Sequence, residues 1–115
     1  MADLSAQRVI RVLSADEIEQ MLASHRLYLK TEYHEGHRSD FSSADLTGLD
    51  FAGLDLRGIK MDRAVLRGAN FIGANLRGAN LVAASFLDAS LAKAEMEFAV
   101  MANAVLQGAC LCGPI

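Results

Sequence analysis

Residues 69–83 read ANFIG-ANLRG-ANLVA, three near-copies of one five-residue block. The spacing continues outward from this stretch in both directions, because every fifth residue from Phe41 to Leu111 is Leu, Phe or Met. An unbroken apolar column of fifteen at the overall hydrophobic content of 52% has a chance probability on the order of 10⁻⁴. We predict that this column forms the core. Its members are Phe41, Leu46, Phe51, Leu56, Met61, Leu66, Phe71, Leu76, Leu81, Phe86, Leu91, Met96, Met101, Leu106 and Leu111.

A second column lies two residues before each of these positions. It is mostly alanine, and every fifth residue from Ala64 to Ala109 is Ala. Two residues after the large apolar residue, glycine is frequent, as at Gly48, Gly68 and Gly78. A small, a large and a flexible residue therefore recur in a fixed order.

Neither regular secondary structure buries a column of period five. On an α-helix five residues advance by about 500°, so the apolar residues scatter around the axis. On a flat strand an odd spacing sends alternate members to opposite faces. A chain that turns through about a right angle every five residues does bury the column, and four such segments close a coil of about twenty residues that stacks on the next.

The blocks at 44–48 (ADLTG), 69–73 (ANFIG), 74–78 (ANLRG) and 79–83 (ANLVA) resemble the pentapeptide-repeat family, A-(D/N)-L-x-x. The resemblance implies an all-β solenoid, a right-handed quadrilateral parallel β-helix of about 3.75 coils. It covers residues 39–113, with both columns inside and the other three positions of each block facing solvent. We expect two parts: an extended segment and a capping α-helix over 1–38, and the β-helix over 39–115.

The repeat weakens after residue 81, where the glycines give way to residues such as Asp88, Lys93 and Phe98. The alternative for 83–106 is an Ala-rich helix, because Ala, Leu, Met, Lys and Glu are good helix formers. The apolar column stays in phase through Leu106 and Leu111, which favours continued coils.

A helix is predicted before the first repeat. Ser14 and Glu17 form a capping box, and apolar residues follow at helical spacing from about 15 to about 32, with Gly36 as terminator. Residues 8–13 look extended. Family members similarly place a helix with an L…H…L pattern here, which residues 21–29 (MLASHRLYL, with His25) resemble. Its expected role is to cover the open end of the stack; recruiting a partner is the alternative.

Length and charge exclude several classes of protein. A chain of 115 residues that is 52% hydrophobic fits one folded domain. The formal net charge of −3 argues against a nucleic-acid binder that uses a basic surface. No apolar run is long enough to cross a membrane, and Arg8 and Arg11 interrupt the only early apolar stretch, which is wrong for a signal peptide. We expect a cytoplasmic protein with no membrane contact.

Candidate chemical sites are few. His34 and His37 lie close to Glu32 and Glu35, but a metal ion needs three or four ligands fixed by structure, and this stretch reads as a connector. Cys110 and Cys112 flank an inward residue and are expected to be reduced surface thiols, with a site shared across a two-fold axis as the alternative. Two cysteines imply no disulfide framework.

Catalysis finds no support. No nucleophile elbow and no phosphate-binding loop occur. Asp40, Asp45, Asp50 and Asp55 recur every five residues, so we expect them to support corners by bonding to the backbone. A filled solenoid is also expected to leave no pocket of substrate size. The sequence therefore predicts no enzyme, no cofactor, no metal site and no small-molecule substrate.

The favoured function is a non-catalytic scaffold or protein–protein interaction module whose partner the sequence does not identify. Apolar residues at outward positions gather in the last two coils, which is typical of an interface. We expect a homodimer through the C-terminal coil, since family members similarly often dimerise there. The predicted interface comprises Val82, Leu87, Phe98, Val100, Val105, Leu106 and Leu111.

The alternative function comes from the same resemblance. Some pentapeptide-repeat proteins mimic DNA, bind type II topoisomerases and confer quinolone resistance. That mimicry needs a strongly negative surface, whereas residues 38–115 hold seven Lys and Arg against eight Asp and Glu.

Overall fold

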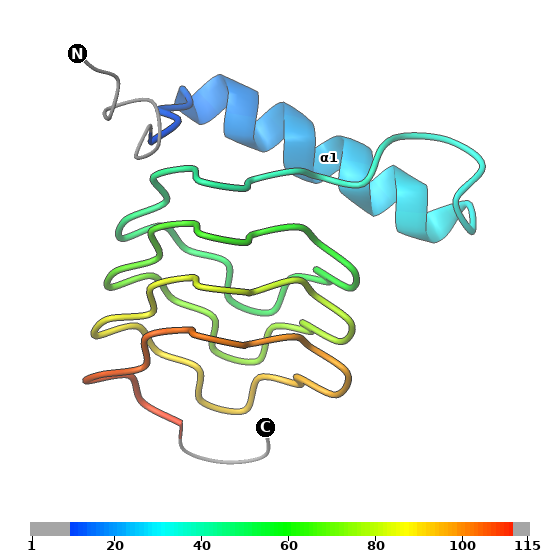
Figure 1. Ribbon diagram of the computed structural model, residues 1–115. Helices are drawn as coiled ribbons and strands as arrows, with labels where there is room; N and C mark the ends of the chain where they lie inside the picture. Colours follow the sequence, from blue (N-terminus) through cyan, green and yellow to red (C-terminus); the bar gives the residue numbers. More distant parts are fainter. Residues whose placement is uncertain (1–9, 112–115) are drawn as a thin grey trace.

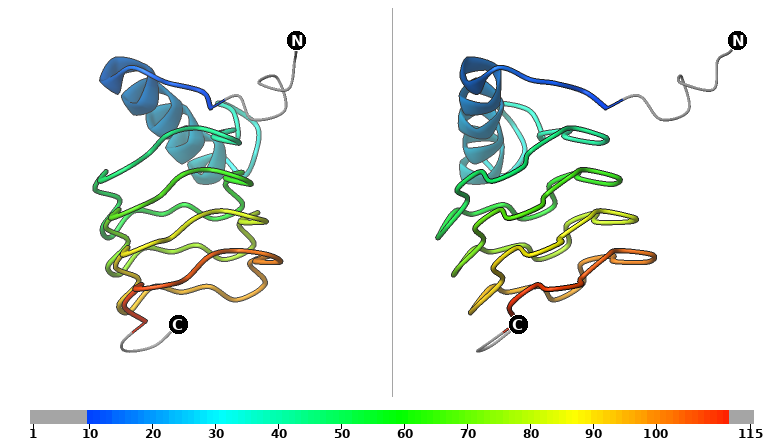
Figure 2. Two further views of the ribbon diagram at one scale, coloured as in Figure 1. Left: turned by 60° about the vertical axis from the view of Figure 1, so that its left-hand side comes forward. Right: turned by 90° about the vertical axis from the view of Figure 1, so that its left-hand side faces the viewer.

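The backbone winds in stacked coils, and one helix lies across the first of them (Figure 1). The computed structural model describes residues 10–111. Parallel bridges join residues 20 apart, from Asp40↔Lys60 to Ser90↔Cys110. Lys60 shows the pattern: its N–H donates to Ser39 at 3.1 Å, and its carbonyl accepts from Phe41 at 2.7 Å. Figure 2 shows the coils in register from two further sides.

Pairing between coils takes the form of single bridges, because each straight segment between two corners is short. At every corner the residue two places after the large apolar residue has a positive φ, which is 67° at Gly68 and 68° at Gly78. Glycine adopts this conformation without steric cost. Ala83, Asp88, Lys93, Phe98 and Asn103 adopt a φ of 59–63° at the same place, at about 1–2 kcal/mol each.

The coils continue through residues 83–106, so the alternative of an Ala-rich helix there is wrong. The bridges Asn75↔Glu95 and Ser85↔Val105 keep the same register as those in the first half. Burial of the apolar column is worth about 1.5–3 kcal/mol per large side chain, which outweighs the strain at the non-glycine corners.

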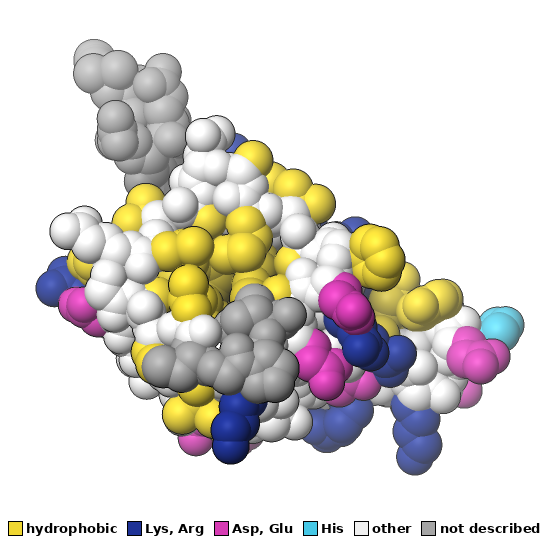
Figure 3. All heavy atoms as spheres, turned by 90° about the horizontal axis from the view of Figure 1, so that it is seen from below, with side chains coloured by type: hydrophobic (Ala, Val, Ile, Leu, Met, Phe, Trp, Pro, Cys, Tyr) yellow, Lys and Arg dark blue, Asp and Glu magenta, His cyan; other side chains and the backbone are white. Residues whose placement is uncertain are grey.

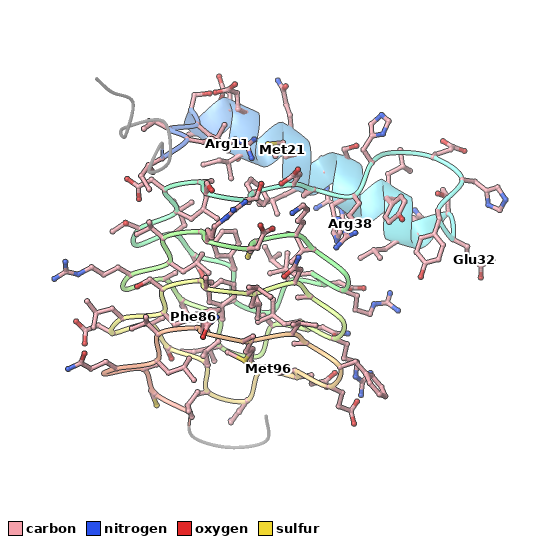
Figure 4. All side chains as sticks on the ribbon, in the orientation of Figure 1. Arg11, Met21, Glu32, Arg38, Phe86 and Met96 are labelled. Carbon is pink, nitrogen blue, oxygen red and sulfur yellow. The ribbon has the colours of Figure 1, made fainter. Side chains whose placement is uncertain are left out.

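The interior is filled with side chains. The large apolar column is buried from Phe41 to Met96. Phe51 and Phe71 lie in successive coils and stack at 4.9 Å, and Phe86 meets Phe71 edge-on at 5.7 Å. Figure 4 shows Phe86 and Met96 inside the stack.

The end of the column differs from the expectation that all its members are core residues. Met101 is half-buried, whereas Leu106 and Leu111 are 36% and 45% exposed. Among residues 10–111 no further coil lies beyond these two side chains to cover them. The prediction of a core position is therefore wrong for Leu106 and Leu111.

Helix α1 spans Ala15–Lys30, and its capping box is confirmed. The Glu17 N–H donates to Ser14 Oγ at 3.0 Å, and the Ser14 N–H donates to Glu17 Oε1 at 2.8 Å. The bond from the Ser14 backbone holds the pKa of Glu17 below its usual value. No helix in the described part of the chain is long and apolar enough to cross a bilayer.

The helix ends at Lys30, close to the predicted end at about 32, but Gly36 is not its terminator. Thr31 is the C-cap residue, and its hydroxyl donates to the Leu27 carbonyl at 2.8 Å. Gly36, at φ +73°, instead lies where the returning chain crosses the helix, and a Cβ there would collide with the Ser24 carbonyl. The glycine is needed for this close approach.

His25 joins α1 to the first coil and is buried. Its Nδ1 accepts from the Ser39 N–H at 3.0 Å. Nε2 therefore carries the proton that it donates to the Arg57 carbonyl at 2.9 Å. Burial also lowers the pKa of His25, which favours the neutral ring that the bond from Ser39 requires.

Arg11 satisfies a further part of the first coil's edge, between α1 and the stack (Figure 4). Its N–H donates to the Ser43 carbonyl at 2.8 Å, and its carbonyl accepts from Asp45 at 2.9 Å. Its Nη1 donates to the carbonyls of Asp40 and Ser42, both at 3.0 Å. The predicted extended segment is thus a bridge at Arg11, and its first residues, 8 and 9, lie outside the described part.

Candidate interaction surfaces

The end of the stack farthest from α1 exposes apolar side chains (Figure 3). Four residues of the predicted interface contribute to this end: Val100, Val105, Leu106 and Leu111, exposed by 50%, 45%, 36% and 45%. We call this set the terminal-coil patch. A gathered apolar surface of this kind is typical of an interaction site.

The other three predicted interface residues lie elsewhere. Val82 and Leu87 are half-buried and sit 20 residues before Ala102 and Gln107, one coil further into the stack. Phe98 is 89% exposed, but it stands at a corner and lines a groove that runs toward the end of α1. Their shared place in the last two coils and their outward positions do not show this difference in the sequence.

The groove was not predicted, because the expectation of no pocket of substrate size concerned the filled stack alone and not the turn after α1. The interior is full, yet the turn after α1 overhangs one column of corners and creates a concavity. We call this concavity the corner groove; it is lined by Tyr28, Leu29, Tyr33, Arg38, Arg57, Gly58, Arg77, Gly78 and Phe98.

The arginines of the corner groove are held by neighbouring groups. Arg57 makes a bidentate pair with Asp55, with Nε and Nη2 each 2.8 Å from a carboxylate oxygen. Arg77 Nε lies 2.7 Å from Glu97 Oε1, and its Nη1 lies 3.5 Å from Glu95. Arg38 donates from Nε to the Gly58 carbonyl. Within residues 10–111, Nη1 of Arg57 and Nη2 of Arg77 have no partner, so donors remain for a bound group.

The acidic column supports corners, as its spacing predicted. Asp40 Oδ1 accepts from the Ser42 N–H at 3.0 Å, and Asp45 Oδ1 accepts from the Thr47 N–H at 3.1 Å. The hydroxyls of Ser42 and Thr47 also donate to these carboxylates and hold the pKa of both below its usual value. Asn70 and Asn75, in the next coil, and Asn80, in the coil after it, make the same backbone contact.

The residues weighed as metal ligands are not brought together. In the described part of the chain, no group of three or more His, Cys, Asp or Glu side chains could hold one ion. His34 Nδ1 lies 2.9 Å from the Thr31 carbonyl in the turn after α1. Cys110 is exposed, and Cys112 lies outside the described residues.

Comparison with known proteins identifies the repeat. A family model described as pentapeptide repeats matches residues 37–63, 59–94 and 79–113, with 8 copies. No curated protein matches the chain.

Solved structures show the same architecture. A pentapeptide repeat protein from the thylakoid lumen of Arabidopsis thaliana is 35% identical, with a TM-score of 0.58 over 59% of this chain and 47% of that one. A pentapeptide repeat protein from the cyanobacterium Cyanothece 51142 is 28% identical, with a TM-score of 0.59 over 61% of this chain and 48% of that one. The chain spans about half the length of these structures, and the likeness gives it the right-handed quadrilateral β-helix.

Proposed function

Because this chain belongs to the pentapeptide-repeat family, whose members are generally non-enzymatic, we propose that it is a non-catalytic scaffold that binds proteins through its outer surface. We further propose a capping role for α1 on a stack of about 3.75 coils, and self-association through the last coil. The observation that carries self-association is the terminal-coil patch, which stands exposed at the end opposite α1. The filled interior leaves the outside as the place of action.

The expected assembly is a two-fold dimer. Two copies of one patch close on each other and leave no sticky end, whereas head-to-tail stacking meets α1 across the first coil. A dimer covers Leu106 and Leu111, which the chain's own coils leave exposed. It also places the exposed apolar surface of Val100 and Val105 against the apolar patch of the second copy.

Light scattering on the 115-residue chain tests the dimer. We expect a dimer at micromolar concentration and a monomer for Leu106→Lys, because a lysine at the centre of the patch would lose its hydration on association. Ala52→Lys is the matched control, since Ala52 is an exposed residue of the first coil, and this variant should remain dimeric. A monomeric wild type, or a dimeric Leu106→Lys variant, contradicts self-association through this coil.

The alternative, a DNA-mimicking inhibitor of a type II topoisomerase, has less support. Several basic side chains of the coils pair with neighbouring carboxylates: Lys60 and Arg63 with Asp62, and Arg57 with Asp55. The surface therefore mixes charges of both signs instead of presenting the negative field of a duplex.

A gyrase supercoiling assay separates the two proposals. We expect no inhibition by this protein at micromolar concentration. The carboxylates that would have to imitate DNA phosphates pair with neighbouring Lys and Arg side chains. The double variant Arg57→Glu, Arg77→Glu, whose surface is more negative at this column of corners, is assayed beside the wild type. Strong inhibition by the wild type would overturn the scaffold assignment in favour of DNA mimicry.

A further inference from the structure

We propose that the corner groove binds an extended acidic segment of a partner protein, one that alternates carboxylate and apolar side chains. The inference rests on the proposed scaffold function and gives the chemistry of its partner. It uses a surface separate from the terminal-coil patch, apart from the neighbourhood of Phe98.

All the charged side chains that line the groove are arginines, and the carboxylates that pair with two of them lie at its border. Three of its lining residues are arginines and none is Asp or Glu, although the whole chain carries a formal net charge of −3. The carboxylates of Asp55, Glu95 and Glu97 pair with Arg57 and Arg77 and fix these two side chains. Guanidinium groups held in this way lose little conformational entropy when they bind a further carboxylate.

The aromatic side chains at the walls of the groove are largely exposed to solvent and are available to contact a partner. Tyr33 is 67% exposed and packs against Tyr28 at 4.9 Å. Phe98 is 89% exposed and occupies a corner at φ +63°. The other corner residues share this φ, so what distinguishes Phe98 is a large apolar side chain exposed at a corner.

Two glycines shape the recess between these walls. Gly58 and Gly78 precede Phe98 in the same column of corners, and nothing lies within 4 Å of the place where a Cβ would stand on either. Successive coils are about 4.8 Å apart. An extended chain laid along the column therefore meets Arg57 and Arg77 in turn, with the aromatic rings of Tyr33 and Phe98 at its two ends.

A nucleic acid fits this groove less well than a peptide. A polyanion that continues beyond the groove meets Asp55, Glu95 and Glu97 at its border, and the negative protein repels it at long range. A protein segment can place its carboxylates within the groove and carry neutral residues where it leaves the groove. Protein is the occupant that the charge pattern favours.

The test is a titration of ¹⁵N-labelled protein with a short peptide of alternating Glu and Leu, blocked at both ends. We expect saturable shifts of the Gly58 and Gly78 amides that weaken with added salt. The same peptide with Gln in place of Glu should bind about tenfold more weakly, since it cannot form charge-assisted bonds.

Phe98→Gly is the informative variant, because glycine already occupies this corner at Gly58 and Gly78 and relieves the strain. It should keep the fold and lose about tenfold in affinity. Lys93→Gly makes the same change at a corner outside the groove and should bind as the wild type does.

Repeating the titration on Leu106→Lys separates this inference from self-association. Binding by that variant supports the groove whatever its oligomeric state. Equal binding of the Gln peptide, shifts confined to other amides, unchanged affinity of Phe98→Gly, tighter binding of poly(dT), or no binding at all would each overturn the proposal.

Discussion

Leu66→Asp is expected to unfold the protein. Leu66 is fully buried and stands in one column with Leu46 and Phe86, each 20 residues away. A carboxylate there has no polar partner and no space for water, at a cost of several kcal/mol. That cost is comparable with the whole stability of a small domain, about 5–15 kcal/mol.

Circular dichroism and urea denaturation check this result. The wild type should show β structure with a minor helical part, and the variant should lose both together. Arg67→Asp is the matched control, because Arg67 is the next residue and is exposed, and it should keep the spectrum. A Leu66→Asp protein with an unchanged urea midpoint would contradict the buried column.

The second large effect is expected at His25. Replacement by alanine removes the acceptor of the Ser39 N–H and the donor to the Arg57 carbonyl, and it leaves a cavity under α1. We expect a loss of about 2–4 kcal/mol in the free energy of unfolding. His37→Ala provides the control, because His37 is exposed and its bonds to Ser24 come from its backbone N–H.

The pH dependence of stability gives a second readout of His25. Burial lowers the pKa of His25 in the folded state. The hydrogen bond to the Arg57 carbonyl and the charge of Asp55 oppose that shift, and the charges of Arg38 and Arg57 assist it. Its contribution is complete above the unfolded value of about 6.5 and is lost as the pH falls below it. The stability difference between wild type and His25→Ala should therefore shrink between about pH 7 and pH 5, before the carboxylates titrate. A difference that is constant over this range would show that the ring nitrogens do not hold α1.

The repeat was readable from the sequence because an odd period leaves few backbone solutions. The column from Phe41 to Met96 is buried where the spacing predicted it, and the Asp45 carboxylate bonds the backbone at its corner. Ser14 and Glu17 likewise mark the start of α1, since capping depends on residues close in the chain.

Features that depend on contacts distant in sequence could not be read in the same way. Gly36 looked like a helix terminator, but its φ serves the crossing of the chain over Ser24. The corner groove leaves a partial signal, because Gly58, Gly78 and Phe98 recur every twentieth residue. The sequence alone does not show that the turn after α1 places Tyr33 beside that column.

The terminal-coil patch and the corner groove both depend on the stacking of residues 20 apart. Amide NOEs test this stacking most directly. We predict short inter-coil contacts linking Val65 to Ser85 and Ser85 to Val105, because these residues bridge in successive coils. The pattern must extend through residues 83–106 without a break. Sequential helical NOEs over that range, with no contact between Ser85 and Val105, would contradict the stacked fold and with it both proposed surfaces.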